Sequence, residues 1–330
     1  MKKYFLLTLL LLMTPYFAFS QTRVEEQVSI ELSPQHPGPN ELVIVSIESF
    51  QIDLNKSEIN WLVNGTLQES GFGLKTFSFT TGSLGEETNL SVRIVKQNGE
   101  ITTKNISVNP GGVDLYYEPQ TYTPPFYKGK PEFTFQSDLK IIALPNFVDQ
   151  NGNKIPSGNI VYNWKIDGSA DQINSGVGRD VYNYQSGILS GPVQVVLEAS
   201  PINSNQSARV VETVRPTEPT ILIYEKNPIY GTIFEQNIKN DFIVNREEIE
   251  LVAIPYNFSQ DIIRNGTFKW LLNGERVNNF ISNNIIFRKT DDRESSNNIT
   301  IEIEHKNKVL QIKRYSFPLN FGGGNNEFNF

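Results

Sequence analysis

The chain has no cysteine and only two histidines among its 330 residues. Without cysteine there can be no disulfide and no thiolate chemistry. His36 and His305 lie too far apart in the sequence to suggest a zinc site or a histidine-assisted nucleophile. We expect both histidines to be exposed turn residues. The folded chain must be stabilised by packing alone.

Positive charge is also scarce. Lysine and arginine together number 29 against 36 acidic residues, and the formal net charge is −7. No basic cluster is present, so nucleic acid is not an expected partner. The sequence has no phosphate-binding glycine loop and no nucleophile elbow, and no spacing among the carboxylates selects a catalytic pair. We therefore predict a protein that is not an enzyme and binds no small-molecule cofactor.

The sequence also lacks an apolar run of the length that usually spans a membrane. Residues 1–20 carry Lys2 and Lys3, a short apolar run over residues 4–13, and Ala18-Phe19-Ser20. This pattern predicts a Sec signal peptide cleaved after Ser20, although the segment could instead be kept as an anchor. We expect a periplasmic, cell-surface or secreted protein that meets the membrane only transiently, through this segment.

One motif occurs three times in the chain. Each of its three tryptophans is followed after two residues by Asn-Gly or Asp-Gly, in the segments Asn60–Gly65, Asn163–Gly168 and Lys269–Gly274. The copies stand roughly 100 residues apart, the length of one small all-β domain. Asn-Gly and Asp-Gly supply the left-handed positions of a tight hairpin turn. We predict Trp61, Trp164 and Trp270 to be core residues on the third strand of each copy.

Short alternating strands separated by turn residues surround each motif, as in immunoglobulin-like sandwiches. Proline and glycine mark the boundaries near residues 110–112 and 215–219. The predicted fold class is all-β, with three tandem immunoglobulin-like β-sandwich domains after the signal peptide. The predicted ranges are a signal peptide at 1–20, domains at 21–109, 113–215 and 220–321, and a flexible Gly/Asn tail at 322–330.

Two segments of the second copy carry a family resemblance. Val161–Gly168 resembles the third-strand motif of PKD domains, and Val148–Pro156 resembles the segment before that strand in bacterial Ig-like domains of invasin type. The resemblance implies exported surface proteins built from tandem sandwiches that act as adhesins, spacers or binding modules. It brings no catalytic residues with it.

An aromatic and proline-rich segment over residues 116–135 is the candidate binding surface. Tyrosine on a stiff loop offers a large contact area at little ordering cost. We name Tyr122, Phe126 and Tyr127 as candidate binding residues. The rings could instead cover a sheet edge or fill the junction with the first domain, and the matching Tyr224, Tyr230 and Phe234 of the third copy favour such a structural role.

No metal site is predicted, and calcium is the one metal whose ligands the sequence offers. Asp149–Asn153 and Asp291–Glu294 carry suitable oxygens. The first segment is more simply a hairpin turn, and Arg293 offsets the charge of the second. We predict a non-enzymatic protein that mediates protein–protein or surface interactions at the bacterial cell envelope, as an adhesin or scaffold, with protein or surface-polymer partners. The alternative is a carbohydrate-binding module that uses the aromatic segment.

Overall fold

The computed structural model describes residues 28–125, 127–188, 191–239, 242–277, 282–290 and 295–322. The predicted leader and nearly all of the predicted tail lie outside these ranges. The structure divides into two compact units. Of the described residues, the first unit holds 28–35, Val43–Phe79 and Asn89–Ile106, and the second holds His36–Leu42, Thr80–Thr88 and those from Ser107 onward. Within the described ranges, no helix has both the length and the apolarity to span a membrane.

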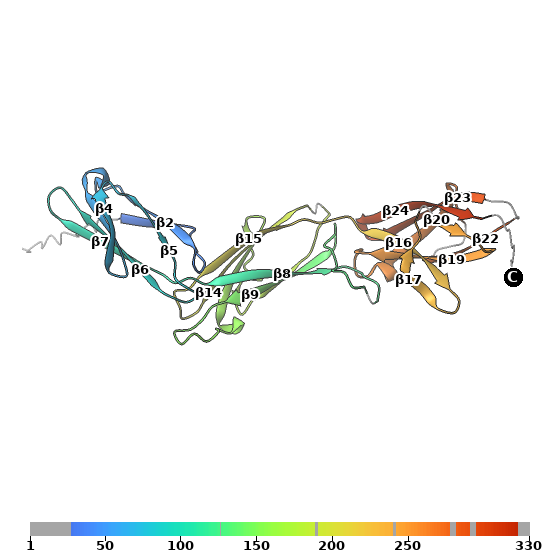
Figure 1. The fold of residues 1–330 in the computed structure, drawn as a ribbon, viewed down its shortest axis with the longest axis horizontal. Helices are drawn as coiled ribbons and strands as arrows, with labels where there is room; N and C mark the ends of the chain where they lie inside the picture. Colours follow the sequence, from blue (N-terminus) through green and yellow to red (C-terminus); the bar gives the residue numbers. More distant parts are fainter. Residues whose placement is uncertain are drawn as a thin grey trace, which may run out of the picture. The chain divides into compact units, whose positions relative to one another are not determined.

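The described residues form six β-sheets, and each tryptophan motif lies in a different pair of them. Figure 1 shows the strands of these pairs along the chain. The sheets of a pair enclose one apolar core, as the core residues of the second and third pairs show. The predicted fold class, all-β with three tandem sandwiches, is confirmed.

The first sandwich contains a three-stranded and a four-stranded sheet. The three-stranded sheet has the order β1-β2-β5, with β1 at Val28–Ser33, β2 at Leu42–Ser49 and β5 at Thr76–Thr80. The other has the order β4-β3-β6-β7, with β3 at Glu58–Val63, β4 at Thr66–Phe72, β6 at Thr88–Val95 and β7 at Ile101–Val108. A 3-10 turn, η1, spans Leu54–Lys56. Trp61 of β3 stacks on Phe77 of β5, with ring centroids 5.5 Å apart, so the tryptophan joins the two layers.

The second sandwich pairs the sheet β13-β9-β8 with the sheet β11-β10-β14-β15, to which β12 adds on β10. The first sheet is built from β8 at Gly112–Gln120, β9 at Asp138–Asn146 and β13 at Val181–Tyr184. The second is built from β10 at Ile160–Ile166, β11 at Ser169–Ala170, β12 at Gly176–Val177, β14 at Val193–Pro201 and β15 at Ala208–Val214, with the 3-10 turn η2 at Ser157–Asn159 before β10. Leu139, Ile141 and Ala143 alternate along β9 and are buried in the core, whereas Leu144 on the other face is exposed.

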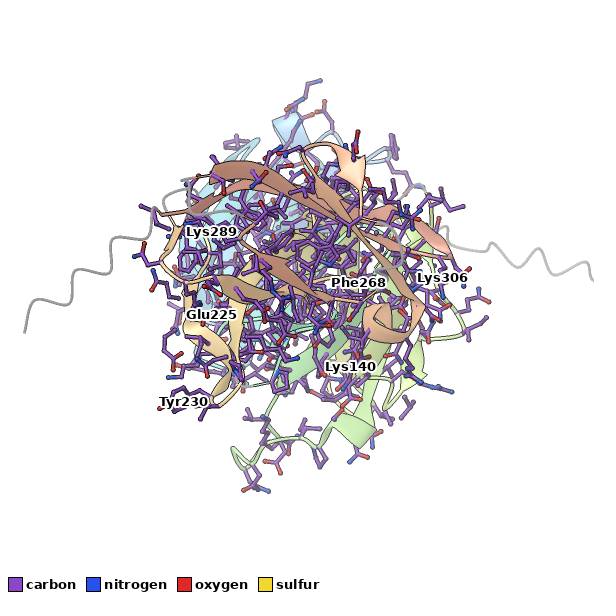
Figure 2. All side chains as sticks on the ribbon, turned by 90° about the vertical axis from the view of Figure 1, so that its right-hand side faces the viewer. Lys140, Glu225, Tyr230, Phe268, Lys289 and Lys306 are labelled. Atoms are coloured by element: carbon purple, nitrogen blue, oxygen red, sulfur yellow. The ribbon has the colours of Figure 1, made fainter. Side chains whose placement is uncertain are left out.

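The third sandwich pairs the sheet β17-β16-β19-β22 with the sheet β18-β24-β23-β20-β21. The first is built from β16 at Thr220–Asn227, β17 at Gly231–Asn237, β19 at Glu248–Tyr256 and β22 at Asn284–Arg288. The second is built from β18 at Ile243–Val244, β20 at Gly266–Leu272, β21 at Glu275–Arg276, β23 at Ser295–His305 and β24 at Lys308–Phe321, and the single helical turn α2 at Ile262–Asn265 precedes β20. In Figure 2, Phe268 lies among the packed side chains, and Tyr230 projects at the rim.

All three tryptophans are fully buried and make the same polar contact. A buried indole N–H needs an acceptor, and in each sandwich it finds a backbone carbonyl just before a strand of the opposite sheet. The indoles of Trp61, Trp164 and Trp270 donate to the carbonyls of Leu74, Arg179 and Ser282 at 3.0, 2.8 and 3.0 Å. The tryptophan therefore fixes the distance between the two sheets as well as filling the core.

The turn after each tryptophan explains why the motif ends in Asn-Gly or Asp-Gly. Asn64, Asp167 and Asn273 have φ of 48, 49 and 53°, and the glycines that follow have φ of 78, 79 and 90°. In each copy the Asn or Asp side chain also accepts a hydrogen bond from the neighbouring strand, from the backbone N–H of Asn89, Gln194 and Asn298 at 2.8, 2.8 and 2.9 Å. The residue is thus selected both by its tolerance of the left-handed region and by its side-chain oxygen.

Candidate functional site

The aromatic segment of the second sandwich lies against the third sandwich. The backbone N–H of Tyr122 donates to the carbonyl of Phe258 at 2.7 Å, and the N–H of Asn257 donates to the carbonyl of Tyr122 at 2.8 Å. Thr121 and Ser259 form an antiparallel bridge beside these bonds. The segment therefore pairs with the loop after β19 as a short strand would.

A network of buried polar side chains completes this junction. Gln311 of β24 is fully buried, and its side-chain oxygen accepts from the backbone N–H of Ser259 at 2.7 Å. Its amide nitrogen donates to the hydroxyl of Thr134 at 3.2 Å and to the carbonyl of Phe135. Thr134, also fully buried, donates to the carbonyl of Asn257 at 2.6 Å. Because a buried polar group without a partner is costly, these bonds favour the joined state of the two sandwiches over the separated one.

Further bonds at the edge of the network cross the same junction. The backbone N–H of Leu310 donates to the side chain of Gln136 at 2.6 Å, and the N–H of Glu132 donates to the side chain of Asn257 at 3.1 Å. Lys313 pairs with Glu218 of the linker at 2.5 Å, and this hydrogen bond holds the pKa of Glu218 below its usual value. The second and third sandwiches are thus joined through both backbone and side-chain contacts.

An aromatic pocket of about 380 Å³ opens beside the junction. Its floor lies on the outer face of the sheet β17-β16-β19-β22, where Tyr224 and Tyr256 belong to an apolar cluster separate from the sandwich core. The two phenol oxygens are 3.0 Å apart and share a hydrogen bond. Tyr127 meets Tyr256 edge-on with centroids 5.4 Å apart, and Phe234 of β17 lies 5.2 Å from Tyr224. Burial first, and then the hydrogen bond that it shares with Tyr224, raise the pKa of Tyr256.

Local backbone geometry holds the Tyr127 ring at the edge of this pocket. The backbone N–H of Tyr127 closes a turn on the carbonyl of Pro124 at 3.3 Å. The ring then lies directly over Gly129, so closely that a Cβ on this glycine would come within 2.3 Å of the phenol. The absence of a side chain at Gly129 is therefore what allows the ring to lie there.

The three candidate binding residues have different environments. Tyr122 is half-buried, and its ring packs against the core of the third sandwich, so its role in the structure is to join the two domains. Phe126 lies outside the described residues. Tyr127 is 41% exposed and lines the pocket.

The pocket also contains residues that sequence reasoning assigned to a structural role. The sequence matches Tyr224 and Phe234 to the aromatic segment as a repeated feature, and in the structure they line one pocket with Tyr127. The third member of that set, Tyr230, is 78% exposed and is not among the pocket's lining residues. Tyr256 was missed, because a tyrosine at the end of a buried strand gives no sign of which neighbour it will face.

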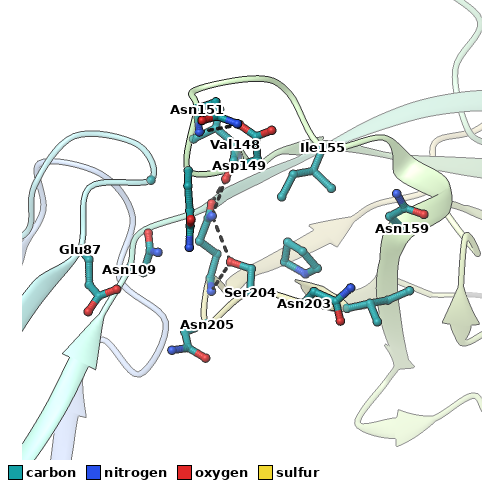
Figure 3. Close-up of a pocket in the computed structure, with 15 residues that line it drawn as sticks. Glu87, Asn109, Val148, Asp149, Asn151, Ile155, Asn159, Asn203, Ser204 and Asn205 are labelled. Carbon is teal, nitrogen blue, oxygen red and sulfur yellow. Dashed lines mark hydrogen bonds between the residues drawn. The ribbon is translucent and has the colours of Figure 1, made fainter.

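A second, larger pocket has several amide side chains in its lining (Figure 3). Loops at residues 148–155 and 201–206 supply most of the lining, and Gly85, Glu87, Asn109 and Asn159 complete it. Gln206 is tied to Val148, donating to its carbonyl at 2.6 Å and accepting from its N–H at 3.3 Å. Much of the polar lining is thus already hydrogen-bonded within the protein.

Of the two segments considered for calcium, the structure describes only the first. The Asp149 carboxylate accepts from the N–H of Asn153 at 2.8 Å, from its side chain at 3.2 Å and from the N–H of Asn151 at 2.9 Å. These bonds, that of Asn153 first, lower the pKa of Asp149. The segment is a hairpin turn that uses its own carboxylate. Asp291–Glu294 lies outside the described residues, and within those that are described no three His, Cys, Asp or Glu side chains gather as metal ligands would.

The prediction that both histidines are exposed is wrong for His305. This residue ends β23 and is only 6% exposed. Its ring contacts Asp261 at 3.1 Å and accepts from the N–H of Asn307 at 3.1 Å, so it caps the β23–β24 turn from inside. His36 is half-buried and lies 2.9 Å from the hydroxyl of Ser207. Hydrogen-bond partners on other segments, which a local sequence pattern does not reveal, account for both positions.

Among the described carboxylates, every pKa that departs clearly from its usual value is lowered. These groups are Glu118, Asp149, Asp171, Glu198, Glu218, Glu250, Asp261 and Glu302. In four of them the largest cause is a hydrogen bond from a lysine, as between Lys165 and Glu198 at 3.0 Å. A general acid needs the opposite shift. These carboxylates serve the sheet surfaces and turns.

Comparison with known proteins gives similarity of structure only. No protein-family model matches the chain, and no curated protein matches it either, so the PKD and invasin-type resemblances remain predictions. The chain is similar to the three N-terminal domains of the outer capsid protein Hoc of bacteriophage RB49, at 8% identity and a TM-score of 0.27, over 91% of this chain and 99% of that one. It is similar to the central fibronectin-III array of RIM-binding protein, at 11% identity and a TM-score of 0.29, over 91% and 97%. It is also similar to a bacterial ice-binding adhesin, at 10% identity and a TM-score of 0.22, over 91% and 99%.

Proposed function

We propose that this is a non-catalytic, exported protein that mediates protein–protein or surface contacts at the bacterial cell envelope, as an adhesin or scaffold does. The observation that carries the proposal is the junction built around Gln311 and Thr134, in which buried polar side chains join two sandwiches. Surfaces held together before binding lose less freedom when a partner docks, so such a junction suits a binding protein.

The ionisable groups support the same function. The lowered pKa values of the carboxylates come from ion pairs and turns that stabilise strands, as where Glu302 lies between Lys269 and Arg314 at 3.3 and 2.7 Å. Such carboxylates stay ionised and hold their hydrogen-bond and ion-pair partners, which suits a charged sheet surface rather than proton transfer.

A second candidate function is carbohydrate binding. The aromatic pocket favours it, because the partly exposed ring of Tyr127 and the aromatic residues of the third sandwich border one concave site. Concave sites with aromatic walls and a few polar groups are the usual form of small-ligand sites.

The proposed function is tested by capture from the native envelope. The full-length chain is immobilised, an extract of the envelope of its own cells is passed over it, and bound material is competed off with free protein. We expect saturable capture of an envelope protein or polymer that is weakened by Gln311→Ala and unaffected by Gln236→Ala, an exposed glutamine of the same sandwich. An envelope substrate that the chain turns over, with activity lost on changing one acidic residue, would contradict the proposal.

A further inference from the structure

The aromatic pocket has the composition of a site for an uncharged, flat, amphipathic ligand. Its walls are the partly exposed rings of Tyr127 and Phe234, and its floor is the pair Tyr224 and Tyr256. The charged residues of the lining are one lysine and one glutamate, Lys128 and Glu132, so neither sign of charge dominates. Its volume of about 380 Å³ falls in the range of about 300–1,000 Å³ that is usual for ligand pockets.

The floor offers a hydrogen-bond donor to such a ligand. Two hydroxyls that share one hydrogen bond use only one of their two protons, so one proton of the Tyr224–Tyr256 pair remains for an acceptor. Both tyrosines are buried, at 6% and 7% exposure, and a buried donor gains more from a ligand oxygen than an exposed one does.

We infer that this pocket binds a unit of a neutral oligosaccharide, and that the site is complete only when the second and third sandwiches are joined. A pyranose ring has an apolar face of C–H groups and a rim of hydroxyls. The rings of Tyr127 and Phe234 suit the first, and the phenol pair and the side chain of Glu132 suit the second. A charged ligand would find only one group of opposite sign.

The site is composite because its walls come from different sandwiches. Tyr127 and Glu132 belong to the second sandwich, and Phe234, Tyr224 and Tyr256 belong to the third. Ligand affinity should therefore depend on the junction, including residues that do not line the pocket. If only a fraction of the molecules has the junction formed, the apparent affinity falls to that fraction of its full value.

The experiment measures binding of the full-length chain to cellohexaose, maltohexaose, xylohexaose and mannohexaose by titration calorimetry. This inference rests on the proposed function, since it gives a ligand class to the interaction surface. We expect at least one hexasaccharide to bind and Tyr127→Ala and Phe234→Ala to weaken it about tenfold or more. Tyr230→Ala, which removes an exposed tyrosine outside the pocket, should leave affinity within about twofold.

Two further variants test the composite site. Gly129→Ala displaces the Tyr127 ring without removing it and should also weaken binding, while Gly187→Ala, where a Cβ meets nothing within 4 Å, should not. Gln311→Ala should weaken binding although the residue is not among those that line the pocket. If no hexasaccharide binds, or if binding survives Tyr127→Ala and Phe234→Ala, the inference is overturned. Capture of an envelope partner alongside that failure would leave the proposed function standing, whereas failure of both would remove both.

Discussion

Gln311→Ala is the substitution that should most damage the joined second and third sandwiches. It removes the acceptor of the Ser259 N–H and the donor to the Phe135 carbonyl, at a position with no exposure to solvent. Each buried polar group left without a partner costs about 1–3 kcal/mol. The groups are neighbours, so the costs overlap. We expect a loss of roughly 3 kcal/mol in the free energy of unfolding.

The loss can be measured by urea unfolding followed by pulsed hydrogen exchange and mass spectrometry. This method reports the unfolding of each sandwich separately, through the peptides that belong to it. With a urea dependence of about 1–3 kcal/mol per molar, the midpoint for peptides covering residues 131–137 and 255–260 should fall by about 1 M or more. Gln236→Ala is the matched control, because this glutamine is exposed on β17 of the same sandwich. A change under about 0.5 kcal/mol in both peptides would refute the reasoning, since that is the size of an ordinary surface substitution.

Three further predictions concern the turns and their carboxylates. Asp167→Ala should destabilise the second sandwich by about 1–2 kcal/mol in urea unfolding, because alanine disfavours the left-handed region and cannot accept the hydrogen bond from Gln194. Asp167→Asn should be nearly neutral, because asparagine occupies this turn position in the other two copies. Hydrogen bonds from Asn174, that of its side chain first, lower the pKa of Asp171. The wild-type protein should therefore lose stability as the pH falls from about 4 through the folded pKa, and the Asp171→Asn variant should lose less over that range. Equal pH profiles of the two proteins would contradict this prediction. Because its own turn occupies the Asp149 carboxylate, a calcium chelator should leave the melting temperature unchanged, whereas a fall of several degrees would show a calcium site.

The fold could be predicted because its determinants are local and repeated. Each structural feature is determined within a short segment of the sequence. Examples are Trp164, the Asp167-Gly168 turn that follows it and the alternating pattern of the strands, each of which is recognisable from residue type and spacing. The same turn dihedrals and the same indole hydrogen bond recur in the other copies.

The site could be predicted only in part, because it depends on which segments meet. Tyr127 could be named from its stiff, proline-bounded loop, yet nothing near it in the sequence indicates that Phe234 and Tyr256 will face it. For the same reason, the sequence does not identify Gln311 as a junction residue and wrongly predicts His305 to be exposed. Their partners lie on distant segments, 177 residues away for the Gln311 bond to Thr134 and 44 residues away for the His305 contact with Asp261.

The joining of the second and third sandwiches can be measured most directly by a distance distribution between spin labels. The chain has no native cysteine, so Ser169→Cys on β11 and Glu275→Cys on β21, both exposed, would take the two labels uniquely. Double electron–electron resonance should give one narrow distribution, which Gln311→Ala broadens. A broad distribution for the protein with Gln311 intact would contradict the account, because the two sandwiches would then move independently.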